Sequence, residues 1–270
     1  MNITVVGAGG MAGHVIVGYL QQQGHQVTAV TRDQLNIEHT QSVSDFFDRL
    51  DTDFLINCVG LLVQPCAVRP DLAAIVNAWF PHYAEYRLQN THTRLIHLST
   101  DCVFDGQAGP YTEHAPHTET NAYGRSKSFG EVRNNKDLTM RTSIIGPELK
   151  MGTGLLNWVT ANPASELPGW DNAWWNGVTT FQMAKCIDQW IHNPTVTGVY
   201  HVVNNQVNIN KYELLCLINQ TYSLGKNIIR TQGPKTVNKI LQDTREEYNW
   251  NIPDYATQLA ELRDWYHRTH

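Results

Sequence analysis

The sequence predicts an α/β fold in which a doubly wound parallel sheet is followed by a smaller mixed region. The chain opens with an apolar run of strand type at Ile3–Val6, followed by a glycine-rich turn, a helix-like segment and a second strand at Gln26–Val30. This is the order and length of a βαβ unit. The alternation of strand runs and amphipathic segments continues to about residue 140 and then becomes irregular. We therefore expect a Rossmann-type sheet with a second, mixed region behind it.

The composition excludes several classes of partner. The 270 residues are 41% hydrophobic and 17% charged, and the net charge is −5. No basic surface for nucleic acid is expected from such a balance. No apolar run is long enough to span a bilayer, and Met1–Gly7 has the pattern of a strand and not of a signal peptide. We expect a cytoplasmic protein with no nucleic-acid and no membrane partner.

The cysteines and histidines do not form a recognisable metal or disulfide pattern. No two of the five cysteines have CxxC spacing, and the twelve histidines include no HExxH or comparable spacing. A reducing compartment fits this usage best. The cysteines stand at Cys58, Cys66, Cys102, Cys186 and Cys216.

A glycine-rich turn follows the first strand. Its glycines include Gly7, Gly10 and Gly13, a GxxGxxG spacing with Gly9 in addition. Glycines allow the backbone to turn tightly and to approach a pyrophosphate, and the free N–H groups of the next helix favour an anion. The position directly after a strand is the context that this motif requires. We predict dinucleotide binding by Gly7, Gly10, Met11 and Gly13.

The end of the second strand bears on the choice of cofactor. Thr31 and Arg32 stand there, with Asp33 just beyond. A guanidinium binds a phosphate as a bidentate fork, so this pair favours the 2′-phosphate of NADPH. NADH stays open, because Arg32 could instead be solvated while Asp33 binds the ribose.

Two helices are expected between the next strands. Ser42–Leu50 has an amphipathic pattern with Ser42 or Ser44 as the N-cap. Ala73–Gln89 is predicted as one long helix, with Asn77 on a mostly apolar stretch. Asn77 either braces the loops of the site or is an amide at the edge of the core.

The third and fourth strands are expected to end at the ligand crevice. Asp53–Cys58 ends in a run of small residues that continues through Val59 to Gly60. Small residues at the carboxyl end of a parallel strand leave room for a ligand. Arg94–Ser99 leads directly into Thr100, whose hydroxyl can hydrogen-bond to a substrate carbonyl.

A tyrosine and a lysine stand four residues apart in the stretch Tyr123–Lys127. On a helix these positions share one face. An ammonium close to a phenol favours the phenolate, so Lys127 is expected to lower the pKa of Tyr123 and to allow proton exchange near neutral pH. Taken alone the pair fits an exposed polar helix start, but its position after the glycine turn and Thr100 favours catalysis.

The second half of the chain has less regular signals. The segment 149–173 is rich in glycine and proline and is expected to be largely loop. The other expected elements are a strand at Asp137–Arg141, helices at Leu155–Thr160, Phe181–His192, Asn210–Leu224 and Tyr255–His267, and strands at Gly198–Val203 and Lys226–Arg230.

The expected division is a cofactor domain at 1–142, to which residues 178–204 return. Residues 143–177 and 205–270 then form the smaller substrate domain. One tryptophan of Trp174 and Trp175 is expected in the core and the other against a sugar or base, and we assign the ligand-facing role to Trp175.

Three stretches together resemble a known family. They are the glycine turn, STDCVFDG at 99–106 and YGRSKSFGE at 123–131. They resemble the extended short-chain dehydrogenase/reductase superfamily, and within it the dTDP-4-dehydrorhamnose reductases. The stretch Thr31–Ile37 also resembles the segment after that family's second strand. The resemblance implies reduction of the C4 ketone of a nucleotide-linked 4-keto-6-deoxy sugar with NADPH or NADH, in deoxysugar and polysaccharide biosynthesis.

The resemblance also implies roles for single residues. Thr100, Tyr123 and Lys127 match the catalytic residues, with Thr100 and Tyr123 also contacting substrate. Further cofactor contacts are implied at Thr31, Arg32, Asn36, Ile37, Cys58, Val59, Gly60, Ser99, Tyr123 and Lys127. Further substrate contacts are implied at Asp101, Cys102, Phe104, Ile144 and Trp175.

The chain departs from the family at two substrate positions. Cys102 stands where the family usually has tyrosine, and Ile144 stands where it often has tryptophan. The acidic metal-binding and dimer features of some members have no clear counterpart here. No metal is therefore expected, and a homodimer stays open.

Other functions fit the same motifs. One is a nucleotide-sugar epimerase or dehydratase that keeps its NAD bound; a bifunctional 3,5-epimerase/4-reductase ranks lower, because no second catalytic pair is visible. Another is a non-catalytic NADP-binding regulatory subunit, like the beta subunit of methionine adenosyltransferase. The sequence leaves the nucleotide (dTDP, UDP or GDP), the sugar and the number of subunits open.

Overall fold

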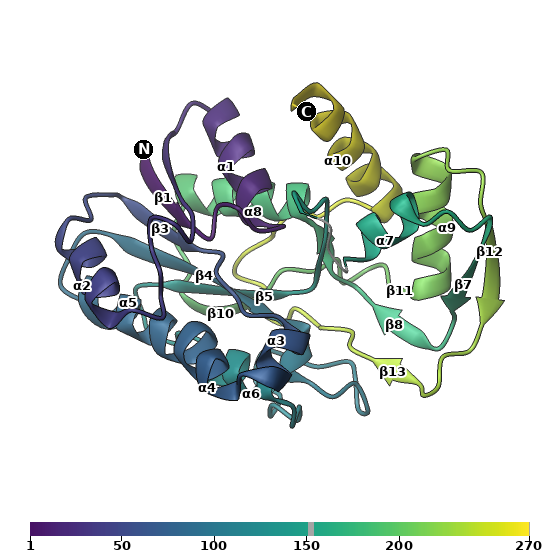
Figure 1. Ribbon diagram of the computed structural model, residues 1–270, viewed down its shortest axis with the longest axis horizontal. Helices are drawn as coiled ribbons and strands as arrows, with labels where there is room; N and C mark the ends of the chain where they lie inside the picture. The colour runs from purple at the N-terminus through teal and green to yellow at the C-terminus, as the bar shows by residue number, and fades with distance from the viewer. Residues whose placement is uncertain (151–153, 270) are drawn as a thin grey trace.

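The computed structural model of this chain describes residues 1–150 and 154–269. Figure 1 shows a layered body that contains the large sheet, and beside it a smaller lobe of helices and short strands. Within the described residues, no helix combines the length and the apolar character needed to cross a membrane.

A six-stranded sheet forms the centre of the larger body, and all of its strands are parallel. Its order is β10-β5-β4-β3-β1-β2. Strand β2 is therefore added on one side of β1, and β3 and the later strands are added on the other side. A ligand crevice is expected at such a reversal, outside the carboxyl ends of the strands. The predicted α/β fold class is confirmed. The strands are β1 (Asn2–Val6), β2 (Gln26–Val30), β3 (Phe54–Asn57), β4 (Arg94–Thr100), β5 (Leu138–Thr142) and β10 (Gly198–His201).

Helices cover both faces of this sheet (Figure 1). On one face α1 (Gly13–Gln22) and α8 (Thr180–His192) pack over a core that contains Ile3, Ile56 and Trp190. The other face has its own core with Phe47 and Phe80. The helices of that second face are α2 (Thr40–Asp48), α3 (Val63–Val68), α4 (Pro70–Ala73), α5 (Phe80–Leu88) and α6 (Ala122–Phe129).

Two helix predictions are corrected by the structure. Helix α2 begins at Thr40 with His39 at the N-cap, so neither Ser42 nor Ser44 caps it. The expected single helix at 73–89 is α4, then a π-helical segment at Ala74–Trp79, then α5. Such π segments are often associated with functional sites, and this one contains Asn77.

The smaller lobe is built from short strands and two helices. It contains α7 (Leu155–Ala161), α9 (Lys211–Thr221), β7 (Glu166–Trp170), β8 (Ala173–Trp175), β11 (Ile209–Asn210), β12 (Asn227–Thr231) and β13 (Val237–Asn238). Strand β7 pairs in parallel with β12. Its sequence was expected to be loop because its proline and glycine weaken the strand signal.

The remaining short elements connect the two parts. They are β6 (Ile144–Ile145) paired with β9 (Val178–Thr179), the 3₁₀ turn Asp101–Val103 and the last helix α10 (Tyr255–Thr269). Helix α9 is capped by Asn210, whose side chain and that of Glu213 form a capping box. Helix α10 packs against both α8 and α9, and so bridges the two parts.

Residues from late in the chain also pack against the large sheet. Tyr248 and Trp250 belong to the apolar cluster that contains Tyr200 and Trp190. The Tyr200 hydroxyl donates to Glu247 at 2.7 Å. The segment around 247–250 therefore contacts the larger body, although we predicted from the sequence that 205–270 belongs to the smaller domain.

A buried polar network joins the end of β5 to its surroundings. The Arg141 guanidinium is fully buried and donates to both carboxylate oxygens of Glu131, at 2.7 and 2.6 Å. It also donates to His201 Nε2 at 2.8 Å. A buried charge is stable only with such complete pairing.

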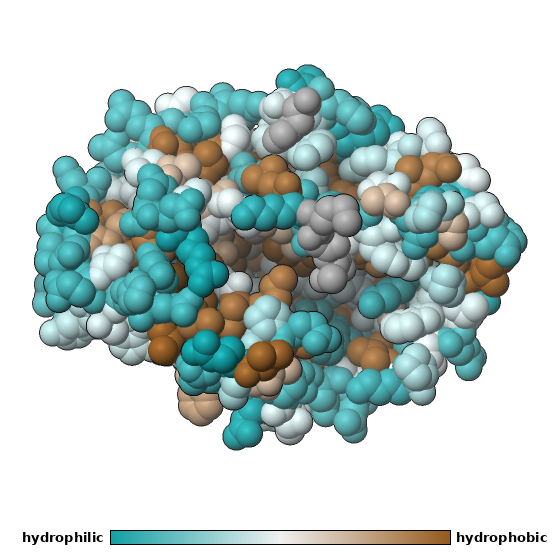
Figure 2. All heavy atoms as spheres, viewed as in Figure 1, coloured by the Kyte–Doolittle hydropathy of each residue, from teal (hydrophilic) through white to brown (hydrophobic). Residues whose placement is uncertain are grey.

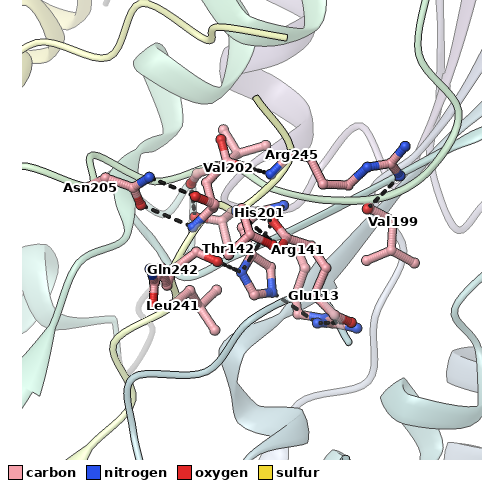
Figure 3. A network of polar contacts seen from close by, with 12 residues as sticks. Glu113, Arg141, Thr142, Val199, His201, Val202, Asn205, Leu241, Gln242 and Arg245 are labelled. Atoms are coloured by element: carbon pink, nitrogen blue, oxygen red, sulfur yellow. Dashed lines mark hydrogen bonds and ion pairs between the residues drawn. The ribbon is translucent and has the colours of Figure 1, made fainter. Parts of the chain in front are cut away.

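The same network holds the segment between β13 and α10 against the sheet by hydrogen bonds (Figure 3). His201 Nδ1 hydrogen-bonds to the Gln242 carbonyl at 3.0 Å, and the Glu113 carboxylate accepts from the Thr244 hydroxyl at 2.6 Å. Because Arg141 donates to Nε2, His201 acts as a neutral acceptor there. Burial and the Arg141 charge accordingly lower the pKa of His201.

Candidate active site

The glycine-rich turn passes close to the end of β3. Gly7 has φ +80°, and a Cβ there would lie 2.9 Å from the backbone of Cys58. A Cβ on Gly13 would lie 2.2 Å from the Gly7 carbonyl oxygen. Both positions therefore require glycine, the first for its conformation and both for the close approach. Helix α1 begins at Gly13, so the free N–H groups of its first turn lie at the end of the glycine-rich turn.

A cavity lies beside the turn, at the carboxyl ends of the neighbouring strands. It brings together seven residues that the sequence assigns to the cofactor: Gly7, Thr31, Arg32, Asn36, Ile37, Val59 and Gly60. Its other lining residues are Val6, Val30, Leu35, Glu38, Leu61, Leu72 and Val76. A mostly apolar cavity with a guanidinium and a carboxylate at its edge has the chemistry to take the adenosine part of a dinucleotide.

Arg32 has an acidic partner six residues along the chain. Its guanidinium pairs with the Glu38 carboxylate, and about three quarters of the Arg32 side chain is exposed. Both side chains line the cavity. A phosphate would attract Arg32 and repel Glu38, whereas ribose hydroxyls could hydrogen-bond to Glu38. The balance between these two residues therefore bears on the choice between NADPH and NADH.

Asn77 braces the cavity wall against the helix of Tyr123. Its Oδ1 accepts from the Leu61 N–H at 2.8 Å, and its Nδ2 donates to the Leu61 carbonyl at 3.0 Å and to the Ser126 hydroxyl at 3.1 Å. Asn77 is 1% exposed. Of the two interpretations that the sequence left open, the structure supports the bracing residue.

Thr100 and Tyr123 lie together at the end of β4. Thr100 is the last residue of the strand, and its hydroxyl accepts from the Cys102 N–H at 3.1 Å. Asn121 caps α6 by accepting from the Gly124 N–H at 2.9 Å, and this sets the first turn that carries Tyr123. The Thr100 hydroxyl donates to the Asp101 carboxylate at 3.2 Å and lies close enough to Tyr123 to affect the pKa of its phenol.

The electrostatics of Tyr123 differ from the expectation. Burial raises the pKa of Tyr123, and the neighbouring Cys102 and Asp101 raise it further. The nearby Thr100 hydroxyl has a smaller, opposing effect. The prediction that this pKa is lowered is therefore wrong for the structure, and Tyr123 keeps its proton at neutral pH.

Lys127 does not hydrogen-bond to the Tyr123 phenol but to the backbone of β4. Its ammonium donates to the Leu98 carbonyl at 2.7 Å. The side chain is buried, and this burial lowers the pKa of Lys127 to about 8, against the opposing effect of Glu131. The lysine is held at the strand backbone, which explains why its charge does not dominate at the phenol.

The other residues assigned to the cofactor have diverse surroundings. Met11 follows Gly10 in the turn and is partly exposed. Burial raises the pKa of the Cys58 thiol to about 12. The Ser99 hydroxyl donates to Glu131 at 2.7 Å and is buried, so it belongs to the internal network.

Two residues assigned to the substrate lie in the core instead. Phe104 is fully buried and stacks on Tyr111 with ring centroids 4.1 Å apart. Trp175 packs against Tyr255, while Trp174, its neighbour on β8, is the exposed tryptophan of the pair. Side chains alternate between the faces of a strand, so only one of the two can face the core. Trp175 therefore faces the core, and Trp174 is the tryptophan of the pair that is open to solvent.

Of the remaining substrate candidates, Asp101 and Cys102 lie near Tyr123. Asp101 is buried beside Thr100, whose hydroxyl lies 3.2 Å from its carboxylate, and burial raises the pKa of Asp101. Burial likewise raises the pKa of Cys102 to about 12. Ile144 is partly buried against the core between the sheet and the helices α1 and α8.

The structure adds Lys239 to this group. Lys239 follows β13 in the smaller lobe, and its ammonium lies 3.7 Å from the Glu119 carboxylate. Cys102, Asp101 and Glu119 lie near this ammonium and raise the pKa of Lys239 against the opposing effect of burial. Sequence spacing gave no signal for this residue, because it lies far along the chain from the motifs that it meets. Figure 2 shows a hollow near the middle of the viewed face, with apolar side chains within it.

Comparison with known proteins gives the family. The model of the RmlD substrate binding domain matches residues 1–148, more than half of the chain. The spore coat polysaccharide biosynthesis protein SpsK of Bacillus subtilis is 29% identical over 97% of this chain and 89% of its own length. The dTDP-4-keto-6-deoxy-D-glucose reductase of Streptomyces niveus is 37% identical over 47% of this chain, but this match spans only 45% of that protein.

Solved structures share the whole fold. A dTDP-4-dehydrorhamnose reductase ortholog of Clostridium acetobutylicum has a TM-score of 0.86 at 21% identity, covering 99% of this chain and 100% of its own. The Bacillus anthracis reductase, solved with NADP, has a TM-score of 0.84 at 20% identity, covering 97% and 98%. The expected family and the enzyme class of NAD(P)-dependent oxidoreductases are confirmed. The chain belongs to the family of the RmlD substrate binding domain, the dTDP-4-dehydrorhamnose reductases of the extended short-chain dehydrogenase/reductase superfamily.

Proposed function

We propose that this protein reduces the C4 ketone of a nucleotide-linked 4-keto-6-deoxy sugar with NADPH. The observation that carries the proposal is the meeting of Thr100 and Tyr123 at the end of β4, with Lys127 on the same helix. These groups lie at the edge of the sheet that also carries the glycine turn, so a cofactor and a carbonyl can meet there.

The residues around the cavity fit a dinucleotide. Gly7 and Gly13 let the turn pack tightly against the end of β3 and against itself, and the free N–H groups at the start of α1 suit the charge of a pyrophosphate. Arg32 at the cavity edge suits a 2′-phosphate. When bound, the nicotinamide supplies the hydride for the ketone carbon.

In this proposal the side chains of the protein supply the proton for the ketone oxygen. Tyr123 has a raised pKa, so it stands protonated and can give its phenolic proton to the ketone oxygen. The Thr100 hydroxyl, which donates to Asp101 in the structure, can donate to the same oxygen when substrate is bound. Lys127, with a pKa of about 8, is mostly protonated at neutral pH and can bind hydroxyls of the nicotinamide ribose.

The choice of substrate class rests on the relatives. Several are named as reductases of dTDP-linked keto sugars. The nucleotide itself stays a matter for experiment, because Cys102 and Ile144 depart from the family pattern at the sugar. The ammonium of Lys239, next to Cys102, is our candidate for contacting a polar or anionic part of the substrate. A cytoplasmic location and the division into a cofactor and a substrate domain belong to the same proposal.

The test is NADPH oxidation against freshly prepared dTDP-, UDP- and GDP-linked 4-keto-6-deoxy sugars, with the stereochemistry of the product read by NMR. Stoichiometric NADPH consumption and a reduced C4 centre are expected. Epimerised product with a tightly held NAD and no consumption of NADPH would identify an epimerase instead. Absence of turnover on the whole panel, with a partner enzyme co-purifying, would favour a regulatory subunit.

A further inference from the structure

Three metal-ligating side chains meet on the side of the molecule formed by α1 and α8. They are His25, in the turn between α1 and β2, and Asp188 and His192 of α8. One ligand atom from each lies within 4.8 Å of the other two. The His25 and His192 rings have centroids 5.4 Å apart. None of these residues takes part in the proposed reaction.

The fold brings each side chain to this point for a local reason. Asp188 and His192 stand four residues apart, so they share one face of α8. His25 follows Gly24, whose φ of +84° makes the sharp turn after α1. The His25 side chain is 5% exposed and that of Asp188 14%, whereas His192 is 59% exposed. Two of the three side chains are thus buried, and the cluster is open to solvent on the side of His192.

The distances suit a small divalent cation. On tetrahedral zinc, with bonds of about 2.0–2.1 Å, neighbouring ligand atoms lie about 3.3 Å apart. The Asp188 carboxylate lies 3.4 Å from His192 Nδ1 and 2.7 Å from His25 Nε2. His192 Nδ1 also hydrogen-bonds to the Asp188 carbonyl at 2.9 Å. Zinc would replace this bond and the bond between His25 and Asp188, or it would bind the other ring nitrogen of His192 after a rotation of the exposed ring.

We propose that His25, Asp188 and His192 form a zinc-binding site, with the exposed side left for water. Two imidazoles and one carboxylate are a ligand set that Zn²⁺ accepts, whereas Mg²⁺ prefers oxygen ligands. The site lies at the opposite end of α1 from the glycine turn, so its role is structural: it ties the α1–β2 turn to the end of α8.

The surrounding charges favour a cation. Burial raises the pKa of Tyr19 to about 12, and the nearby carboxylates of Asp188 and Glu261 raise it further. The ammonium of Lys185 is paired with Glu261 at 2.9 Å. One carboxylate therefore remains at the site itself to offset part of the metal charge.

In the first experiment, metal-free protein without a histidine tag is titrated with ZnCl₂, and binding is measured by isothermal titration calorimetry. Wild-type protein is expected to bind one zinc per chain, and MgCl₂ should give no binding. His192→Ala should weaken zinc binding at least tenfold. Because His192 is exposed, this variant should keep its fold, as circular dichroism can check. The matched control is His92→Ala, which removes an exposed histidine elsewhere.

The second measurement is thermal unfolding with and without zinc. Zinc should raise the Tm of the wild type and of His92→Ala, because it binds only the folded arrangement, and the shift should vanish in His192→Ala and in His25→Asn. If wild-type protein takes up no zinc, the proposal fails. It also fails if His192→Ala and His92→Ala bind zinc as wild type does. Neither readout depends on reductase activity.

Discussion

Tyr123 carries the clearest prediction at the scale of single residues. Tyr123→Phe removes only the phenolic oxygen, so the cavity beside the glycine turn should keep its affinity for NADPH. Loss of a positioned acid should lower kcat about 10²–10⁴-fold. The measurement pairs steady-state turnover with a fluorescence titration of NADPH. Turnover near that of wild type would remove Tyr123 from the proposed chemistry.

Arg32 and Glu38 decide the cofactor in our proposal. Arg32→Ala should raise the KM for NADPH about tenfold or more, because a charge-assisted bond to the 2′-phosphate is lost. The KM for NADH should change little. Glu38→Gln is the matched variant: it frees Arg32 from its carboxylate partner and should lower the KM for NADPH. Equal changes with both cofactors would show that Arg32 does not contact the phosphate.

At the scale of elements, the π-helical segment at Ala74–Trp79 has a definable purpose. It contains Asn77, which holds Leu61 of the cavity wall and Ser126 of α6 together. Gly130, just after α6, lies so close to this segment that a Cβ there would be 1.9 Å from the Asn77 carbonyl oxygen. The π segment and α6 are therefore in close backbone contact below the site.

Asn77→Ala should act on both stability and cofactor binding. It leaves the backbone groups of Leu61 and the Ser126 hydroxyl without their partner, so we expect a loss of about 1–3 kcal/mol in the free energy of unfolding. The KM for NADPH should rise as the wall loosens. Urea unfolding and steady-state kinetics measure the two effects. Asn90→Ala, at an exposed position, is the control and should change neither.

At the scale of the whole molecule, buried histidines make stability depend on pH. Burial is the largest cause that lowers the pKa of His117 to about 4, and Arg141 adds to it. The unfolded chain takes up this proton near its ordinary pKa of about 6.5. Between those values the unfolded state binds more protons, so stability falls as the pH falls from about 6.5 to 4.

This effect predicts a measurable difference between pH 7 and pH 5. His117 alone should cost wild-type protein of the order of 2 kcal/mol in the free energy of unfolding over that interval. Urea unfolding of His117→Gln should show a smaller loss than wild type. His92→Gln should show the wild-type loss, because that histidine is exposed. An unchanged loss in His117→Gln would place the acid sensitivity elsewhere in the molecule.

Local patterns predicted the parts of the site that lie close together in the sequence. The glycine turn, the residues at the end of β2 and the Tyr123–Lys127 pair could all be named from spacing, because periodicity determines which face of a helix a residue occupies. The pKa of Tyr123 could not, since it depends on burial and on Cys102 and Asp101 around it. Likewise, alternation on β8 showed that one tryptophan faces inward, but only packing chose Trp175.

The sequence by itself determined the α/β class, the parallel strands and the family. These depend on hydrophobic period and on short motifs, which act within a few residues. The tertiary structure decided which distant groups meet: Glu38 with Arg32, Lys239 with Cys102, and His25 with Asp188 and His192. Such contacts depend on how helices and loops pack over the sheet, and the local hydrophobic periodicity of the sequence does not predict them.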